Sequence, residues 1–138
     1  MLDVDALPQV EVAFMNADHR EEARLLNALT EALAALREGR GGQGEVTRRW
    51  AALLQHTREH FAREERAMEE TQFPPLEIHR AEHELVLSAM EAEAHAFDEG
   101  GDAARLARYV ERAMPAWLLR HIETMDLVTA RFLAARGV

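Results

Sequence analysis

The chain has 138 residues, carries a net charge of −9 and contains no cysteine. This length fits a single domain with its own core, which we take as residues 1–138. The charge makes nucleic acids and anionic membranes poor partners, and the lack of cysteine excludes disulfides, thiolate metal sites and iron–sulfur clusters. Residues 1–14 do not resemble a signal peptide, and no apolar run approaches the ~20 residues of a membrane span. We therefore expect a soluble, cytoplasmic domain.

Abundant alanine, leucine, glutamate and arginine favour helices over strands. We predict an all-α fold, an antiparallel four-helix up-and-down bundle with an N-terminal extended arm. The arm covers residues 1–15. The first helix covers about residues 17–38, with Asn16 or Asp18 as its N-cap and Gly39 at its end.

Glycines and prolines mark the next boundaries. A connector rich in glycine, Gly39–Gly44, leads to a second helix at about residues 45–71. Pro74 and Pro75 end that helix and open a third at about residues 75–97, because proline is tolerated in a first helical turn.

The fourth predicted helix covers about residues 102–135. Gly100 and Gly101 precede it, and Asp102 is its expected N-cap. Pro115 lies inside this stretch, where it removes one backbone donor and clashes with the carbonyl group four residues before it. The sequence therefore predicts a kink or break near Met114.

Each predicted helix carries one apolar stripe, as a bundle requires. Several ionisable residues interrupt these stripes: His19, His60, Glu64, His79, His83, His121 and Asp126. Burying a carboxylate or imidazole among leucines costs several kcal/mol unless it finds a partner. A metal site shared by all four helices would provide that partner, since both side chains bind first-row transition metals.

The spacing within the stripes supports a shared site. His60 with Glu64 and His79 with His83 are four residues apart, so each pair lies on one helix face. His121 and Asp126 are five apart, which places them about 140° apart around a regular α-helix. We predict a local widening, such as a single π-type turn, within residues 121–126.

Each of these residues alone has a simpler explanation. A lone His19 is more often a hydrogen-bonded core residue, and His60 with Glu64 alone is more often a surface ion pair. The full set on inward faces makes a metal site the better interpretation.

His95 lies on a polar face and is expected to be solvated, whereas His56, one turn before His60, is an alternative chelating partner that we leave outside the metal ligands.

The same residues resemble the hemerythrin family. The run from His60 to Met68 matches the HFxxEExxM signature, and His79 to His83 resembles the HxxxH that follows it. Residues 117–126 are similar to the family's WLxxHIxxxD. Asp18-His19, followed by Leu25, Leu26 and Asn27, resembles the first-helix histidine segment, so the resemblance covers about residues 16–133.

The resemblance implies a four-helix bundle that carries two non-haem iron ions bridged as Fe–O–Fe or Fe–OH–Fe. It implies that His79, His83 and His121 bind one iron, and that His19 and His60 bind the other. Glu64 and Asp126 would bridge both. The second iron then keeps an open position, where hemerythrins bind dioxygen reversibly.

The ligand set favours oxygen binding over oxidation of a substrate. Ferritin-like oxidase sites use four carboxylates and two histidines, whereas this set has five histidines and two carboxylates. We expect a protein that stores, delivers or senses dioxygen, as a monomer or small homo-oligomer. The alternative is an enzyme on the same site that reduces peroxide or handles nitric oxide.

A dry pocket should surround the open position. The candidates for its lining are Trp117, Leu118, Ile122, Phe61 and Leu26, although each is individually consistent with ordinary core packing. Glu123 interrupts the apolar run beside His121. On a regular helix it faces solvent, but a widened turn that directed it inward would favour proton transfer and the enzymatic alternative.

Overall fold

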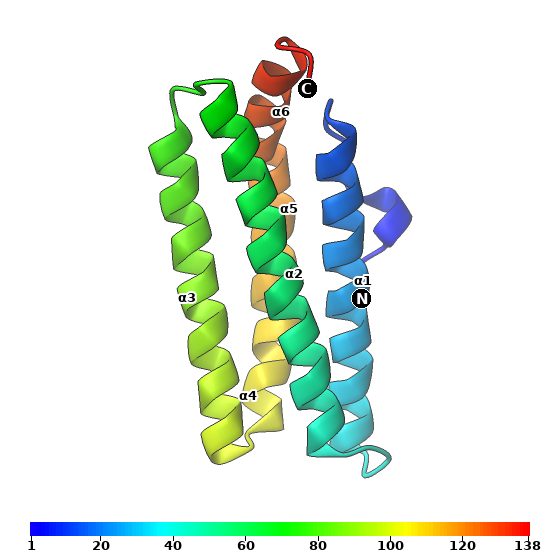
Figure 1. Ribbon diagram of the computed structural model, residues 1–138. Coiled ribbons are helices and arrows are strands. Elements are labelled where there is room, and N and C mark those ends of the chain that lie inside the picture. The colour runs from blue at the N-terminus through cyan, green and yellow to red at the C-terminus, as the bar shows by residue number, and fades with distance from the viewer.

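A computed structural model, which describes residues 1–138, contains four long helical stretches and no strand (Figure 1). The first three are α1 (Ala13–Arg37), α2 (Gln43–Glu70) and α3 (Leu76–Gly100). The fourth is built from α4 (Ala103–Arg108), α5 (Met114–His121) and α6 (Leu127–Ala134), which two π-helical turns, η2 (Tyr109–Ala113) and η3 (Ile122–Asp126), join.

The four stretches alternate in direction, which confirms the predicted antiparallel bundle (Figure 1). The start of α1, the α2–α3 connection and the C-terminus lie at one end. The α1–α2 and α3–α4 connections lie at the other end. None of the helices combines the length and the apolar character that crossing a membrane demands.

The N-terminal segment is shorter and less extended than the predicted arm over residues 1–15. A 3₁₀ turn, η1 (Val4–Ala6), interrupts it, and α1 already begins at Ala13. Asn16 does not cap the helix, because its side chain is engaged elsewhere. Its Oδ1 accepts from the Val10 N–H at 2.9 Å and its Nδ2 donates to the Val10 carbonyl at 2.8 Å. The side chain expected to start the helix therefore fastens the preceding segment to it.

The ends of α1 and α3 follow the predicted glycine signals. Gly39 and Gly101 have φ angles of 72° and 64°, in the left-handed region that glycine adopts without strain. The Gly101 N–H donates to the Phe97 carbonyl at 2.7 Å. The chain thus reverses immediately after each helix, which keeps neighbouring helices antiparallel.

Pro115 changes the fourth stretch without breaking it. The turn η2 precedes the proline, and the Met114 N–H donates to the Tyr109 carbonyl, five residues back. This wider turn accommodates a residue that cannot donate to the carbonyl four residues before it. The predicted kink near Met114 is therefore a π-helical turn over Tyr109–Ala113.

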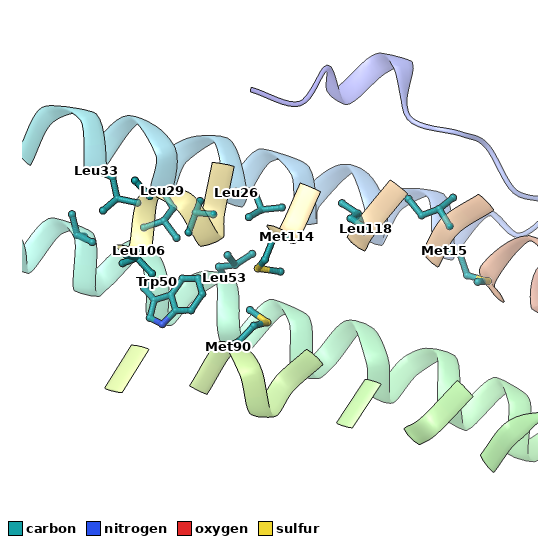
Figure 2. Close-up of a cluster of buried hydrophobic side chains, with 14 of the residues drawn as sticks. Met15, Leu26, Leu29, Leu33, Trp50, Leu53, Met90, Leu106, Met114 and Leu118 are labelled. Carbon is teal, nitrogen blue, oxygen red and sulfur yellow. The ribbon is translucent and has the colours of Figure 1, made fainter. Parts of the chain in front are cut away.

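The apolar core runs along the bundle, and one part of it lies near the α1–α2 connection. Figure 2 shows Leu29 and Leu33 of α1 facing Trp50 and Leu53 of α2, with Leu106 of α4 beside them. All five are buried, and a fully buried leucine contributes about 1.5–3 kcal/mol relative to an exposed one. This packing supports a bundle that also holds buried polar side chains.

Candidate metal centre

The site begins with two regular helical chelates. On α2, His60 Nε2 lies 2.8 Å from Glu64 Oε2, one helical turn away. On α3, the rings of His79 and His83 lie 4.5 Å apart between centroids. The four-residue spacing therefore brings each pair to one inward face, as the sequence predicts.

The third pair depends on the π-helical turn η3. Within it the Leu127 N–H donates to the Ile122 carbonyl, five residues back. The wider turn rotates Asp126 onto the face of His121, and His121 Nε2 lies 3.2 Å from Asp126 Oδ1. The widening predicted within residues 121–126 is confirmed, because a regular helix would separate these two side chains.

His19 joins the site from α1. Its Nε2 lies 2.9 Å from Asp126 Oδ2 and 3.8 Å from Glu64 Oε2. The contact links residues 107 positions apart in the chain. All four helical stretches therefore supply side chains to one place.

The seven residues form two groups of potential metal ligands that share Glu64. One group is Glu64, His79, His83, His121 and Asp126, and the other is His19, His60 and Glu64; within each, the ligand atoms lie within 4.8 Å of one another. None of the seven is more than 3% exposed.

The nitrogen and oxygen atoms that face the site would be satisfied better by metal ions than by hydrogen bonds to one another. His79 Nε2 and His121 Nε2 face each other at 3.1 Å. Glu64 Oε1, His83 Nε2 and Asp126 Oδ1 are buried without a hydrogen-bond partner. Unpaired buried polar atoms are costly, and a mixed imidazole and carboxylate set suits first-row transition metals. The residues present therefore fit a metal centre.

The electrostatics of the site keep its carboxylates ionised. Burial and Asp126 raise the pKa of Glu64, but His60 and His83 outweigh them and lower it to about 2. Burial also opposes ionisation of Asp126, yet the nearby imidazoles of His121, His19 and His79 hold its pKa well below the usual value. Two buried anions thus face five histidines, an arrangement that attracts cations.

Two histidines are oriented by partners on their outer sides. His83 Nδ1 lies 2.9 Å from Glu65 Oε2, and His79 Nδ1 lies 2.9 Å from Thr129 Oγ1. Such contacts fix a ring so that its other nitrogen faces the metal. Helical spacing alone does not reveal these roles, although Glu65 adjoins Glu64 and Thr129 lies on the apolar face of the fourth stretch.

Two of the five predicted pocket residues, Phe61 and Trp117, stack on histidines of the centre, whereas the other three belong to the apolar core. Leu26, Leu118 and Ile122 are buried, and the Phe61 ring stacks on His83 with centroids 3.8 Å apart. Trp117 is half-buried and stacks on His121 at 4.5 Å.

The remaining candidates lie outside the centre. Glu123 is exposed despite the widened turn, so it does not reach the site. His95 is exposed as predicted. His56 Nε2 lies 3.1 Å from the Asp18 carbonyl and does not enter either of the two groups that share Glu64.

Comparisons with known proteins agree with this geometry. The family model described as Hemerythrin HHE cation binding domain matches residues 10–133. The chain is 35% identical over 126 residues to a bacteriohemerythrin of Ralstonia nicotianae, covering 91% of this chain and 83% of that protein. It is 28% identical over 120 residues to a bacteriohemerythrin of Aquifex aeolicus, covering 87% and 88% respectively. No solved structure matches significantly.

Proposed function

The chain belongs to the hemerythrin family, and on this premise we propose that its centre holds two iron ions and binds dioxygen reversibly. In this proposal His79, His83 and His121 bind one iron, and His19 and His60 bind the other. Glu64 and Asp126 bridge the two. The bound pair would supply the redox chemistry that reversible oxygen binding requires, while the chain's own residues would hold and shield it.

The orientation of the two carboxylates carries the proposal. Glu64 Oε2 lies 2.8 Å from His60 Nε2, whereas Glu64 Oε1 lies 3.4 Å from His83 Nε2. Asp126 Oδ2 lies 2.9 Å from His19 Nε2, whereas Oδ1 lies 3.1 Å from His79 Nε2. Each carboxylate directs one oxygen to each histidine group, as a residue that bridges two metals must.

The unequal histidine count supports a small-molecule ligand at one metal. Three histidines serve one proposed iron and two serve the other, so the second has fewer protein ligands. A position left open by the protein is where a metal centre binds a small ligand. The buried side chains of Phe61, Leu118 and Ile122 would exclude water from that position.

The enzymatic alternative has less support. Proton transfer by Glu123 would require this side chain to point inward, and its exposure removes it from the site. A carrier that stores or delivers dioxygen therefore remains the better-supported function, and its ligand is a gas rather than a macromolecule.

Iron loading and exposure to air test the proposal. We expect two irons per chain and, when air reaches the di-ferrous protein, a visible charge-transfer band that disappears on deoxygenation. Glu64→Gln should abolish the band, whereas Glu123→Gln, the exposed control, should retain it. Irreversible oxidation with turnover of peroxide would favour the enzyme instead, and one zinc ion per chain would refute the di-iron centre.

A further inference from the structure

A further buried carboxylate, Glu22, lies beside the seven residues of the proposed centre. It follows His19 by three residues on α1 and is only 1% exposed. Thr57 of α2 donates its hydroxyl hydrogen to Glu22 Oε1 at 2.5 Å. Burying a carboxylate is costly, so one satisfied oxygen does not by itself account for this position.

The second oxygen of Glu22 faces a ring of the proposed centre. Glu22 Oε2 lies 3.7 Å from His60 Nδ1, and both atoms are buried without a hydrogen-bond partner. The opposite ring nitrogen, His60 Nε2, lies 2.8 Å from Glu64 Oε2. The His60 imidazole is therefore held between two carboxylates, with only its Nε2 side directed to the centre.

His56 does not occupy Glu22 Oε2, so this oxygen is available to His60. His56 Nε2 lies 3.4 Å from Glu22 Oε2 but closer, at 3.1 Å, to the Asp18 carbonyl. A carbonyl oxygen only accepts hydrogen bonds, so His56 Nε2 carries a hydrogen directed at Asp18. Glu22 Oε2 thus retains the capacity to accept a hydrogen bond from His60 Nδ1.

His83 and His79 also have an oxygen facing the outer ring nitrogen, and in both the distance is shorter than for His60. The outer nitrogens of His83 and His79 already lie 2.9 Å from oxygens of Glu65 and Thr129. A metal-bound histidine almost always donates its second ring N–H in this way. For His60 the facing oxygen is that of Glu22, and a normal bond of about 2.9 Å requires an approach of less than about 1 Å.

We propose that Glu22 is a positioning residue for His60, accepting the Nδ1 hydrogen and directing Nε2 toward the metal pair. This inference rests on the proposed metal centre but not on oxygen binding. A carboxylate at this place would bring negative charge beside the metal that has fewer histidines. Because negative charge stabilises the higher oxidation state, Glu22 would make that metal easier to oxidise.

Zinc provides a test that is independent of redox chemistry and of oxygen. We compare zinc affinity in wild type, Glu22→Leu and Glu22→Gln, with Glu31→Gln as the control because Glu31 is an exposed carboxylate of the same helix. Loss of an outer hydrogen-bond partner typically weakens metal binding about 10–100-fold. We expect this loss in Glu22→Leu, partial rescue in Glu22→Gln, whose amide oxygen still accepts, and no change in the control.

A proton resonance and a reduction potential separate positioning from simple packing. In the zinc-loaded protein, the His60 Nδ1 proton should give a downfield, slowly exchanging resonance that Glu22→Leu abolishes. Thr57→Val, which removes the hydroxyl that anchors Glu22 but retains the carboxylate, should weaken the resonance and serves if Glu22→Leu does not fold. In the iron-loaded protein, Glu22→Gln should shift the reduction potential to more positive values than Glu31→Gln.

Three results would overturn the inference or its premise. Unchanged zinc affinity and an unchanged His60 resonance in Glu22→Leu would refute the role of Glu22 alone. A third metal ion per chain that is lost in His56→Ala would also refute it, because Glu22, His56 and His60 would then be ligands themselves. A wild-type chain that binds no pair of zinc ions would refute the metal centre, and the role of Glu22 with it.

Discussion

His121 Nε2 lies 3.2 Å from Asp126 Oδ1 although five residues separate them along one continuous helical stretch. The contact exists because the Leu127 N–H donates to the Ile122 carbonyl and widens the turn between them. Asp126 also lies 2.9 Å from His19 and 3.1 Å from His79, so the same turn brings one carboxylate within reach of three helices. A local departure from α-helical geometry thus connects the two halves of the proposed centre.

Replacing Asp126 should therefore reduce the metal content of the centre. Asp126→Asn keeps the shape of the side chain but removes the charge and one acceptor oxygen. We expect metal content to fall from two ions per chain to one or none, measured by elemental analysis after loading and desalting. Asp98→Asn, an exposed change of the same type on α3, should retain both ions. Retention of two ions in Asp126→Asn would contradict the bridging role.

Much of this centre follows from sequence patterns because each pattern acts within one helix. The four-residue spacings of His60 with Glu64 and His79 with His83 determine which residues share a face. Even the widened turn is predictable, since the spacing of His121 and Asp126 does not fit a regular helix. The structure brings together all seven of the residues that interrupt the apolar stripes.

Interactions between helices were harder to predict. Glu22 follows Glu21 in a charged run that is typical of a solvated surface, and only the approach of α1 to α2 places it against Thr57. Asn16 is a typical N-cap residue, yet it binds the backbone of Val10 instead. Both outcomes depend on distances between segments, which periodicity along one helix does not encode.

Trp117 should control access of solvent to the proposed oxygen pocket. Its indole stacks on His121 at 4.5 Å and donates to Glu82 Oε1 at 2.7 Å. On its other side lies an apolar groove of about 280 Å³ that Leu85 and Ala89 help to line. Removing the indole in Trp117→Ala would connect that groove to the pocket and admit water.

We expect Trp117→Ala to lose its oxygenated spectrum several-fold faster in air than wild type, because water and protons promote autoxidation. Trp50→Phe is the matched control, since Trp50 is a buried indole in the core at the other end of the bundle. Equal autoxidation rates in wild type and Trp117→Ala would show that the indole does not seal the pocket.

Removal of the metals should make stability strongly dependent on pH. In the metal-free chain the pKa of Glu64 is lowered from 4.5 to about 2, so its stabilising contribution is present above about pH 4.5 and is lost as the pH falls toward 2. Burial lowers the pKa of His60, but Glu64 and Glu22 raise it well above its usual value. The contribution of His60 is therefore complete below its unfolded pKa and is lost as the pH rises through its raised pKa.

Metal binding should offset the loss of stability that the metal-free chain shows as the pH rises. Ligand histidines must be neutral, and rising pH removes the protons that compete with the metal. We expect the difference in melting temperature between zinc-loaded and metal-free protein to increase with pH. Circular dichroism melts of both forms across a pH series measure it. Glu64→Gln should remove the acid-sensitive contribution in the metal-free form, and an identical acid profile in that variant would contradict the assignment.

Tyr109 offers a second pH test away from the centre. Burial, with a smaller effect of Glu93, raises its pKa from 10.0 to about 12. The raised pKa stabilises the fold below about pH 10, and this contribution disappears as the pH rises toward 12. Because Tyr109 is the only tyrosine, the absorbance of tyrosinate reports on it alone.

We expect that absorbance to rise with a midpoint near 12 in the folded protein and near 10 after denaturation. Glu93→Gln should lower the folded midpoint, whereas Glu99→Gln, at a largely exposed position on the same helix, should leave it unchanged. A folded midpoint equal to the denatured one would show that Tyr109 is solvated.

The apolar core should determine stability independently of the metals. Leu29 is completely buried among Leu33, Leu53 and their neighbours, whereas Leu85 on α3 is 69% exposed. Leu29→Ala should lower the free energy of unfolding by about 2–5 kcal/mol, because it loses apolar burial and leaves a cavity. Leu85→Ala should change it by no more than about 0.5 kcal/mol, since it vacates no packed space.

Urea denaturation of the metal-free proteins measures both values, and metal analysis should find two ions per chain in each variant after loading. A loss of metal in Leu29→Ala would contradict this independence and would mean that packing at Leu29 is coupled to the centre.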